Sequence, residues 1–274
     1  MPSYKDRATD LEMRVGQRAQ ELAEAYERLQ DLDRLKSKFI DDISHELRTP
    51  VTNLMLYLDL WERGTPQKQQ AYWDVLKKQA GRLAELVEGI IQLSQLELLK
   101  GQMSLDLIDF NRLVREVTQT QQFRIQEHDV QMQVTLTDGL PPVWGDKQQL
   151  VEMTMHLVGN AINYTPSGTI CVQTSFDKET ERICLTVQDT GIGIAPEDMP
   201  HVFERFYRGR GASQSNKPGV GLGLTVAQEV IQLHRGSITV SSEVGKGSTF
   251  YVYLPAHLPL GGIELFIEKN TGFY

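Results

Sequence analysis

Apolar side chains in the first forty residues recur every seven positions, which is the spacing of a coiled-coil helix. One series comprises Leu11, Arg18, Ala25, Leu32 and Phe39. The other comprises Val15, Leu22 and Leu29 and is offset from the first by four residues. A repeat of 3.5 residues predicts a coiled coil, most simply a parallel dimer. Arg18 and Ala25 weaken the apolar seam, so a single helix packed on its own domain remains the alternative.

The apolar pattern then continues at spacings of three and four residues, as in two long amphipathic helices. The first stripe comprises Ile40, Ile43, Leu47, Val51, Leu54, Leu58 and Trp61, and the second comprises Leu76, Leu83, Leu86, Ile90, Leu93 and Leu96. Gly64-Thr65-Pro66 separates them, because glycine ends helices and proline favours the first helical turn. Gly101 ends the second helix. We expect a helical hairpin, and two hairpins would bury their apolar faces as a dimeric four-helix bundle.

From residue 104 onwards, short alternating strands are interspersed with helices. Strands are expected at 131–136, 169–176, 182–188, 237–241 and 249–254, and helices near 110–127, 146–164 and 222–234. This mixture predicts an α+β arrangement, an α/β sandwich with helices on one face of a sheet. Four domains are predicted. They are a coiled-coil helix at 1–38, a helical hairpin at 39–102, the mixed domain at 103–255, and a tail without an assigned role at 256–274.

Composition excludes several classes of protein. The 274 residues are 40% hydrophobic, which suffices for a packed core, and the formal net charge of −8 argues against a broad nucleic-acid surface. Cys171 and Cys184 lie in apolar stretches and are expected to be core residues in a reducing compartment. No apolar run approaches the ~18 residues of a membrane span. We therefore expect a cytoplasmic location, either alone or as the cytoplasmic part of a membrane protein.

His45 lies on the polar side of the first amphipathic helix, roughly 165° from the centre of the apolar stripe. Glu46 adjoins it, Thr49 follows one turn later, and Pro50 is expected to kink the helix. A neutral imidazole is a nucleophile near pH 7, and a neighbouring carboxylate can hold its tautomer and accept its proton. The Thr49 hydroxyl is placed to orient a water for the reverse, hydrolytic reaction. A solvated surface histidine is the alternative.

Three glycine-bearing segments, 189–194, 219–224 and 245–249, suggest a nucleotide site. Glycines where a loop enters a helix let backbone N–H groups approach an anion. The patterns of a dinucleotide fold and of a P-loop are absent. Asn160 and Asn163 share one helix face, and an amide oxygen there can ligate Mg²⁺ carried by nucleotide phosphates.

The polar, glycine-rich loop from Arg208 to Pro218 is expected to be mobile. Arg208, Arg210 and Lys217 give it phosphate-binding charge. An ordinary surface loop is the alternative.

Five segments resemble the H, N, G1, F and G2 boxes of sensor histidine kinases, in the family's order, and these are residues 39–50, 146–166, 189–194, 203–208 and 219–224. The resemblance covers roughly residues 36–255. It implies that the second domain has the ATP-binding fold shared with gyrase-type ATPases.

The resemblance also implies roles for matching residues. His45 is implied as the phospho-acceptor, Glu46 as its acid/base partner, and Thr49 in dephosphorylation of the partner protein. Asn160 matches the Mg²⁺-binding asparagine, and Asp189 the carboxylate that accepts a hydrogen bond from the adenine amino group. The other expected cofactor-binding residues are Asn163, Tyr164, Gly191, Gly193, Arg208, Lys217, Gly219, Gly221, Leu222 and Gly223.

Three positions depart from the family's pattern. His156 stands where an asparagine is usual, Asn163 where a phosphate-binding lysine is common, and Val220 where a threonine is usual. Losing the lysine removes a charge-assisted contact of about 1–3 kcal/mol. We expect activity to survive, with weaker nucleotide affinity.

The resemblance implies a homodimer that uses Mg-ATP to phosphorylate His45 and passes the phosphoryl group to an aspartate of a response regulator. A sensor module outside this chain would drive it, and phosphatase activity toward the regulator is a further expectation. Two other classes stay open. A nucleotide-binding scaffold would bind ATP without labelling, and a plain ATPase would release phosphate independently of His45.

Overall fold

The computed structural model describes residues 4–98, 103–125, 129–211 and 219–257. Contacts divide the chain into two compact units, Met1–Gln79 and Ala80–Tyr274, so the division falls within the second long helix. No helix in the described part of the chain is both long and apolar enough to cross a membrane.

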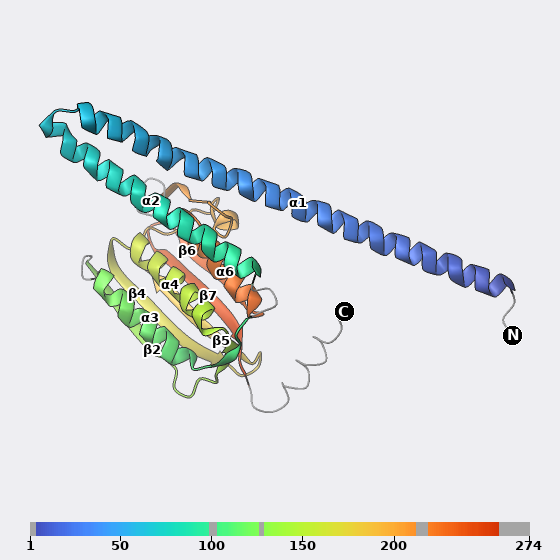
Figure 1. Cartoon of the computed structure of the whole chain (residues 1–274). Coiled ribbons are helices and arrows are strands. Elements are labelled where there is room, and N and C mark those ends of the chain that lie inside the picture. Colours follow the sequence, from blue (N-terminus) through green and yellow to red (C-terminus); the bar gives the residue numbers. More distant parts are fainter. Residues whose placement is uncertain (1–3, 99–102, 126–128, 212–218, 258–274) are drawn as a thin grey trace. The chain divides into compact units, whose positions relative to one another are not determined.

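The first unit contains helix α1 (Tyr4–Arg63) and the first part of helix α2 (Pro66–Leu98) (Figure 1). The turn lies at the predicted Gly64-Thr65-Pro66, where the Lys68 amide donates to the Thr65 carbonyl at 2.9 Å. Aromatic pairs join the two arms near this turn, with Trp61 and Trp73 ring centroids 6.4 Å apart. The hairpin therefore forms as predicted.

Helix α1 continues through Pro50 as one helix, although Pro50 cannot donate the usual backbone hydrogen bond. Much of the predicted apolar stripe is uncovered in the single chain. The Ile40 side chain is 53% exposed and Leu58 is 50% exposed. This face is consequently available to a partner.

The second unit is built on a five-stranded sheet in the order β2-β4-β5-β7-β6. Its strands are β2 (Asp129–Leu136), β4 (Ser167–Asp177), β5 (Arg182–Asp189), β7 (Gly247–Pro255) and β6 (Ser237–Glu243). The β2–β4 pair is parallel and the other pairs are antiparallel. These strands match the predicted ones, with ends that differ by a few residues.

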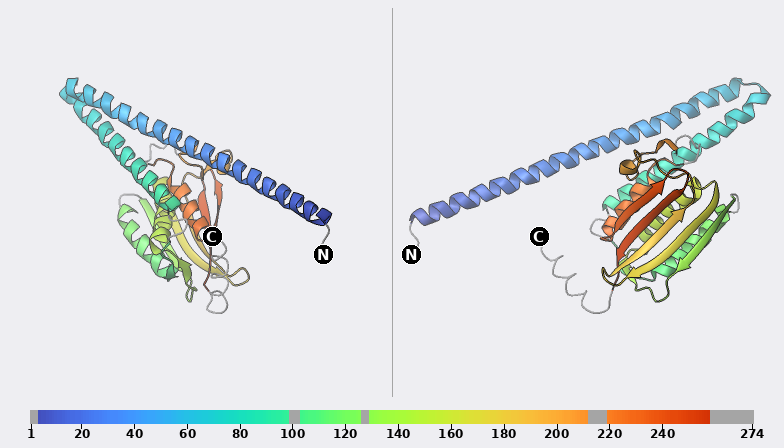
Figure 2. Two further views of the ribbon diagram at one scale, coloured as in Figure 1. Left: turned by 45° about the vertical axis from the view of Figure 1, so that its right-hand side comes forward. Right: turned by 180° about the vertical axis from the view of Figure 1, so that it is seen from behind.

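Helices α3 (Phe110–Ile125), α4 (Lys147–Tyr164) and α6 (Gly223–Leu233) cover one face of this sheet, while the other face carries no helix from the described residues of the second unit (Figure 2). Alternate residues of β5 and β7, such as Leu185 and Val252, are fully buried, as are α4 residues such as Leu157. This burial supplies the main stabilising free energy of the sandwich. The predicted fold class is confirmed.

Short elements escaped the sequence prediction. Strands β1 (Asp106–Ile108) and β3 (Val143–Gly145) pair with each other, and a 3-10 turn, η1, spans Met199–His201. Three residues are too few to display a period of two. Cys171 and Cys184 are free and half-buried rather than fully enclosed in the core.

A buried histidine fixes the start of α4. The His234 Nδ1 lies 2.8 Å from the Val230 carbonyl oxygen, and the Asp146 amide donates to Nε2 at 3.0 Å. The Asp146 carboxylate in turn accepts from the amides of Gln148 and Gln149, which caps the helix. Because α4 carries Asn160 and Asn163, this cap positions much of the candidate site.

Candidate active site

A cavity of about 320 Å³ lies between α4 and the segment that follows β5. Asp189 ends β5 and is buried in its wall. Its Oδ1 accepts hydrogen bonds from the amides of Gly191, at 2.8 Å, and Ser248, at 3.2 Å. Burial raises the pKa of Asp189, and these two bonds oppose the rise. Both bonds end on Oδ1, so Oδ2 can accept a donor from a ligand.

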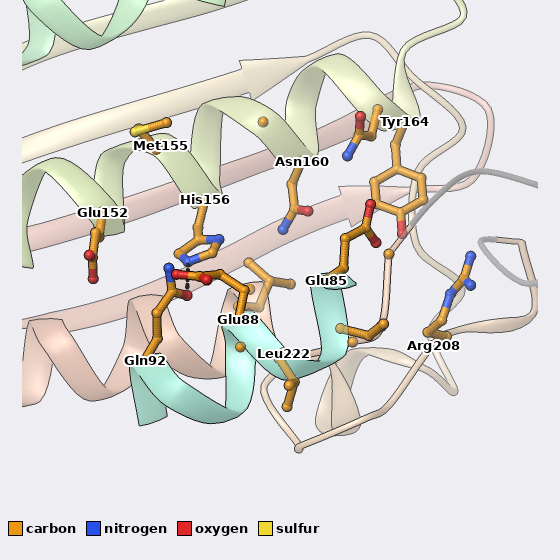
Figure 3. A pocket seen from close by; sticks show the side chains of 18 of the residues that line it. Glu85, Glu88, Gln92, Glu152, Met155, His156, Asn160, Tyr164, Arg208 and Leu222 are labelled. Atoms are coloured by element: carbon orange, nitrogen blue, oxygen red, sulfur yellow. Dashed lines mark hydrogen bonds between the residues drawn. The ribbon is translucent and has the colours of Figure 1, made fainter. Parts of the chain in front are cut away.

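A second cavity, of about 610 Å³, adjoins the first, because Asn160, Tyr164 and Arg208 line both. Its walls come from α3, α4, residues 219–224 and the 84–92 stretch of α2 (Figure 3). The pair of cavities therefore gathers segments that are far apart in the sequence. A combined site of this size accommodates a nucleotide-sized ligand.

The structure brings most of the expected cofactor-binding residues to these cavities. Gly193 and Asp189 line the smaller one, while Asn163, Gly219, Gly221, Leu222 and Gly223 line the larger one. Gly191 contributes through the hydrogen bond that its backbone amide donates to Asp189 Oδ1. Lys217 lies outside the described residues, as does most of the loop expected to be mobile.

Helix α6 begins at the wall of the larger cavity with no side chain capping its first turn. Its N-cap is Leu222, and Gly221 just before it has φ +77°. A Cβ on Gly221 would lie 2.6 Å from the Tyr207 carbonyl oxygen, so only glycine fits. The free amides and the dipole of such a helix start favour a bound anion.

A buried carboxylate, Asp198, organises the segment around Arg208. The Tyr207 hydroxyl donates to Asp198 Oδ1 at 2.7 Å, and the Arg210 amide donates to Oδ2 at 3.1 Å. The bond from Tyr207 raises the pKa of that phenol. Sequence reasoning did not single out Asp198, although an acidic residue five positions after Gly193 was a visible signal.

His156 on α4 contacts α2 within the second unit. Its Nε2 lies 3.3 Å from Gln92 Oε1 (Figure 3). Glu88 and Glu152 line the same cavity. Burial lowers the pKa of His156 to about 4, so the ring is neutral at pH 7 and donates from Nε2 to Gln92. This departure from the family's pattern is therefore used in packing.

Two further positions complete this wall. Val220, another departure, is buried, with 7% of its surface exposed. A Cβ on Gly89 of α2 would lie 2.6 Å from Leu222 Cδ1. Helix α2 therefore approaches the segment before α6 closely at Gly89.

Acid should destabilise the second unit through His156. The pKa is about 4 when folded and about 6.5 when unfolded, so the unfolded state binds more protons between these values and stability falls as pH falls through that window. We expect about 2 kcal/mol of unfolding free energy to be lost from this group between pH 6.5 and 5. Urea titrations of wild type and His156→Asn would measure it, since the variant should lose less. Equal losses in both proteins would contradict the prediction.

The expected phosphoacceptor residues lie in the first unit. The His45 side chain is exposed on α1, Glu46 is half-buried, and Thr49 is exposed. The Thr49 hydroxyl donates to the His45 carbonyl oxygen at 3.4 Å, a long bond that leaves the hydroxyl easily redirected. An exposed imidazole with a neighbouring carboxylate is accessible to a second domain or protein.

Family comparisons match both units. Residues 35–99 match the His Kinase A (phospho-acceptor) domain, and residues 145–258 match the histidine kinase-, DNA gyrase B-, and HSP90-like ATPase family. The circadian input-output histidine kinase CikA of Thermosynechococcus vestitus is 34% identical over 254 residues, which are 90% of this chain and 34% of that protein. The chain spans 34–49% of the length of the first curated relatives that it matches.

Solved structures agree with these matches. The Acinetobacter baumannii histidine kinase AdeS has a TM-score of 0.62 and 27% identity, over 78% of this chain and 98% of that one. Full-length ShkA in complex with AMPPNP has a TM-score of 0.59 and 25% identity, over 80% of this chain and 46% of that one.

Proposed function

The chain belongs to the sensor histidine kinases and carries their catalytic core, and we propose that it phosphorylates His45 with ATP and passes the phosphoryl group to a response-regulator aspartate. A phosphoacceptor domain is followed by an ATP-binding domain in this core. We expect the core to act in the cytoplasm, where ATP is available.

The adenine base occupies the smaller cavity, where the free Oδ2 of buried Asp189 accepts a hydrogen bond from its amino group. The phosphates extend into the larger cavity, toward the amides at the start of α6 and toward Arg208. Asn160 lies between the two cavities and fits a magnesium site. Magnesium is usually held by few protein oxygens together with phosphates and water, and it would neutralise phosphate charge here.

In the phosphorylation step, an imidazole nitrogen of His45 attacks the γ-phosphorus. A nitrogen–phosphorus bond forms, and the bond between the γ-phosphorus and the oxygen of the departing ADP breaks. Glu46 accepts the imidazole proton. Exposure of His45 supports this role, because the nitrogen must reach a nucleotide held by another domain.

In the transfer step, an aspartate oxygen of the response regulator attacks the phosphorus and His45 leaves as imidazole. The reverse signal is hydrolysis of the aspartyl phosphate. Thr49, one turn after His45, orients the attacking water for that phosphatase activity.

The active form is a homodimer. Apolar residues of α1, including Leu22 at 72% exposure, are uncovered in the single chain. A coiled coil over residues 1–38 and a four-helix bundle over 39–102 would bury them, while residues 103–255 form the catalytic domain. An upstream sensor module acts through the coiled coil.

One observation carries the proposal most strongly. Segments from α4, β5, the 203–208 stretch and the start of α6 converge on two adjoining cavities beside a buried carboxylate. Incubation with γ-labelled ATP should give protein-bound phosphate that is labile in acid and stable in base. Bound nucleotide without labelling would favour a scaffold, and phosphate release without protein labelling would favour a plain ATPase.

A further inference from the structure

We propose that Arg124 on α3 is a phosphate-binding residue of the nucleotide site, held in place by Gln121 and Asn163. The inference rests on the proposed function, since it names a further contact of the same site. Arg124 lies outside the segments that resemble the family's boxes. Its assignment comes from contacts in the folded chain.

Two hydrogen bonds fix the Arg124 guanidinium. Nη1 donates to Gln121 Oε1 at 3.1 Å, and Nη2 donates to Asn163 Oδ1 at 3.0 Å. Gln121 is itself buried, with 4% of its surface exposed, and therefore offers a rigid support. These bonds use two of the five N–H donors of a guanidinium. A positioned arginine fork is well suited to phosphate oxygens.

Arg124 also lines the cavity that is expected to hold the phosphates. It lines the larger cavity together with Asn160, Asn163 and Arg208. A Cβ built on Gly159 of α4 would lie 3.6 Å from Nη1, so the guanidinium lies over the α4 backbone one residue before Asn160. Among the described residues that line the two cavities, the cationic side chains are Arg124 and Arg208.

The charges of both arginines act on a carboxylate that lines the same cavity. Glu85 of α2 lines the larger cavity and points toward Asn160 and Tyr164 (Figure 3). Burial raises the pKa of Glu85, while the charges of Arg208 and Arg124 both lower it. The same region of the cavity is therefore within the positive field of both arginines, which is where phosphate groups would be stabilised.

Asn163 acts as a positioning residue in this arrangement. Its side-chain oxygen holds Arg124, and the arginine supplies the positive charge that a lysine at position 163 would supply. The departure from the family's pattern at Asn163 is thereby compensated from a neighbouring helix. We expect the charge, and hence triphosphate affinity, to depend on Arg124.

The test compares the affinities of ATP and adenosine. Arg124→Gln should weaken ATP binding about tenfold or more and leave adenosine affinity within about twofold, because only ATP carries phosphates. Arg115→Gln is the matched control, an exposed arginine of the same helix outside both cavities. The double variant Arg124→Gln/Asn163→Lys should recover most of the ATP affinity by restoring a cation on α4.

Each outcome separates the inference from the proposed function. Wild-type protein that binds neither ATP nor adenosine would overturn the proposed function itself. Wild-type binding that is unchanged in Arg124→Gln would overturn the inference and leave that function standing. Equal losses of ATP and adenosine affinity, without rescue by Asn163→Lys, would show that Arg124 is only structural and would also overturn the inference.

Discussion

Replacing His45 with glutamine is expected to reduce acid-labile labelling by ATP below detection. Glutamine preserves size and polarity but has no nucleophilic nitrogen, so the nitrogen–phosphorus bond cannot form. The side chain is exposed on α1, and substitutions at such positions usually change stability by no more than about 0.5 kcal/mol. ATP affinity should therefore stay at the wild-type value. Gel autoradiography after acid and base treatment, with a parallel binding titration, measures both quantities.

His257→Gln provides the control for this experiment. His257 stacks near Trp144, with ring centroids 5.7 Å apart, and lines neither cavity. Its loss should leave labelling intact. If His45→Gln became labelled as strongly as wild type, another side chain would be the acceptor and the assignment of His45 would be wrong.

Replacing Asp189 with asparagine is expected to weaken binding of both ATP and adenosine by roughly a hundredfold. The asparagine oxygen can still accept the amides of Gly191 and Ser248, which leaves its NH₂ group where Oδ2 stood. The asparagine NH₂ group and the adenine amino group would then face each other as two donors in a buried site. This costs about 1–3 kcal/mol or more of binding free energy. Isothermal titration with the two ligands measures the loss.

Folding must be checked alongside affinity, because Asp189 is a buried residue at the end of β5. Its raised pKa means that burial disfavours the charged carboxylate, so a neutral side chain should not destabilise the strand strongly. Asp177→Asn, at the exposed end of β4, is the control and should bind normally. Unchanged adenosine affinity in Asp189→Asn would place the base elsewhere.

Local pattern was sufficient to predict the long helices and the strands of the main sheet, but not the short elements or all contacts of the site. The Gly64-Thr65-Pro66 turn and the alternating strands follow from residue type and spacing, and they are present. The kink at Pro50 stays a prediction, and α1 is one helix on both sides of that residue.

The missing contacts join residues that are distant in the sequence. Arg124 and Asn163 are 39 residues apart, and His156 and Gln92 are 64 apart. Each pair depends on how two helices pack, which the period of either helix leaves open. Asn163 consequently looked like a lost charge in the sequence, whereas the fold gives it an arginine partner.

Gly89 has a consequence for comparing relatives of this chain. Glycine in the interior of a helix costs about 1 kcal/mol relative to alanine, and at position 89 the missing side chain leaves room for Leu222. An added Cβ would lie 2.6 Å from Leu222 Cδ1 and 3.2 Å from its Cβ, so alanine would require the Leu222 side chain or the two segments to shift. A glycine at position 89 together with a leucine at position 222 is therefore a marker that can be read in any aligned sequence. It identifies kinases in which α2 can approach the start of α6 this closely.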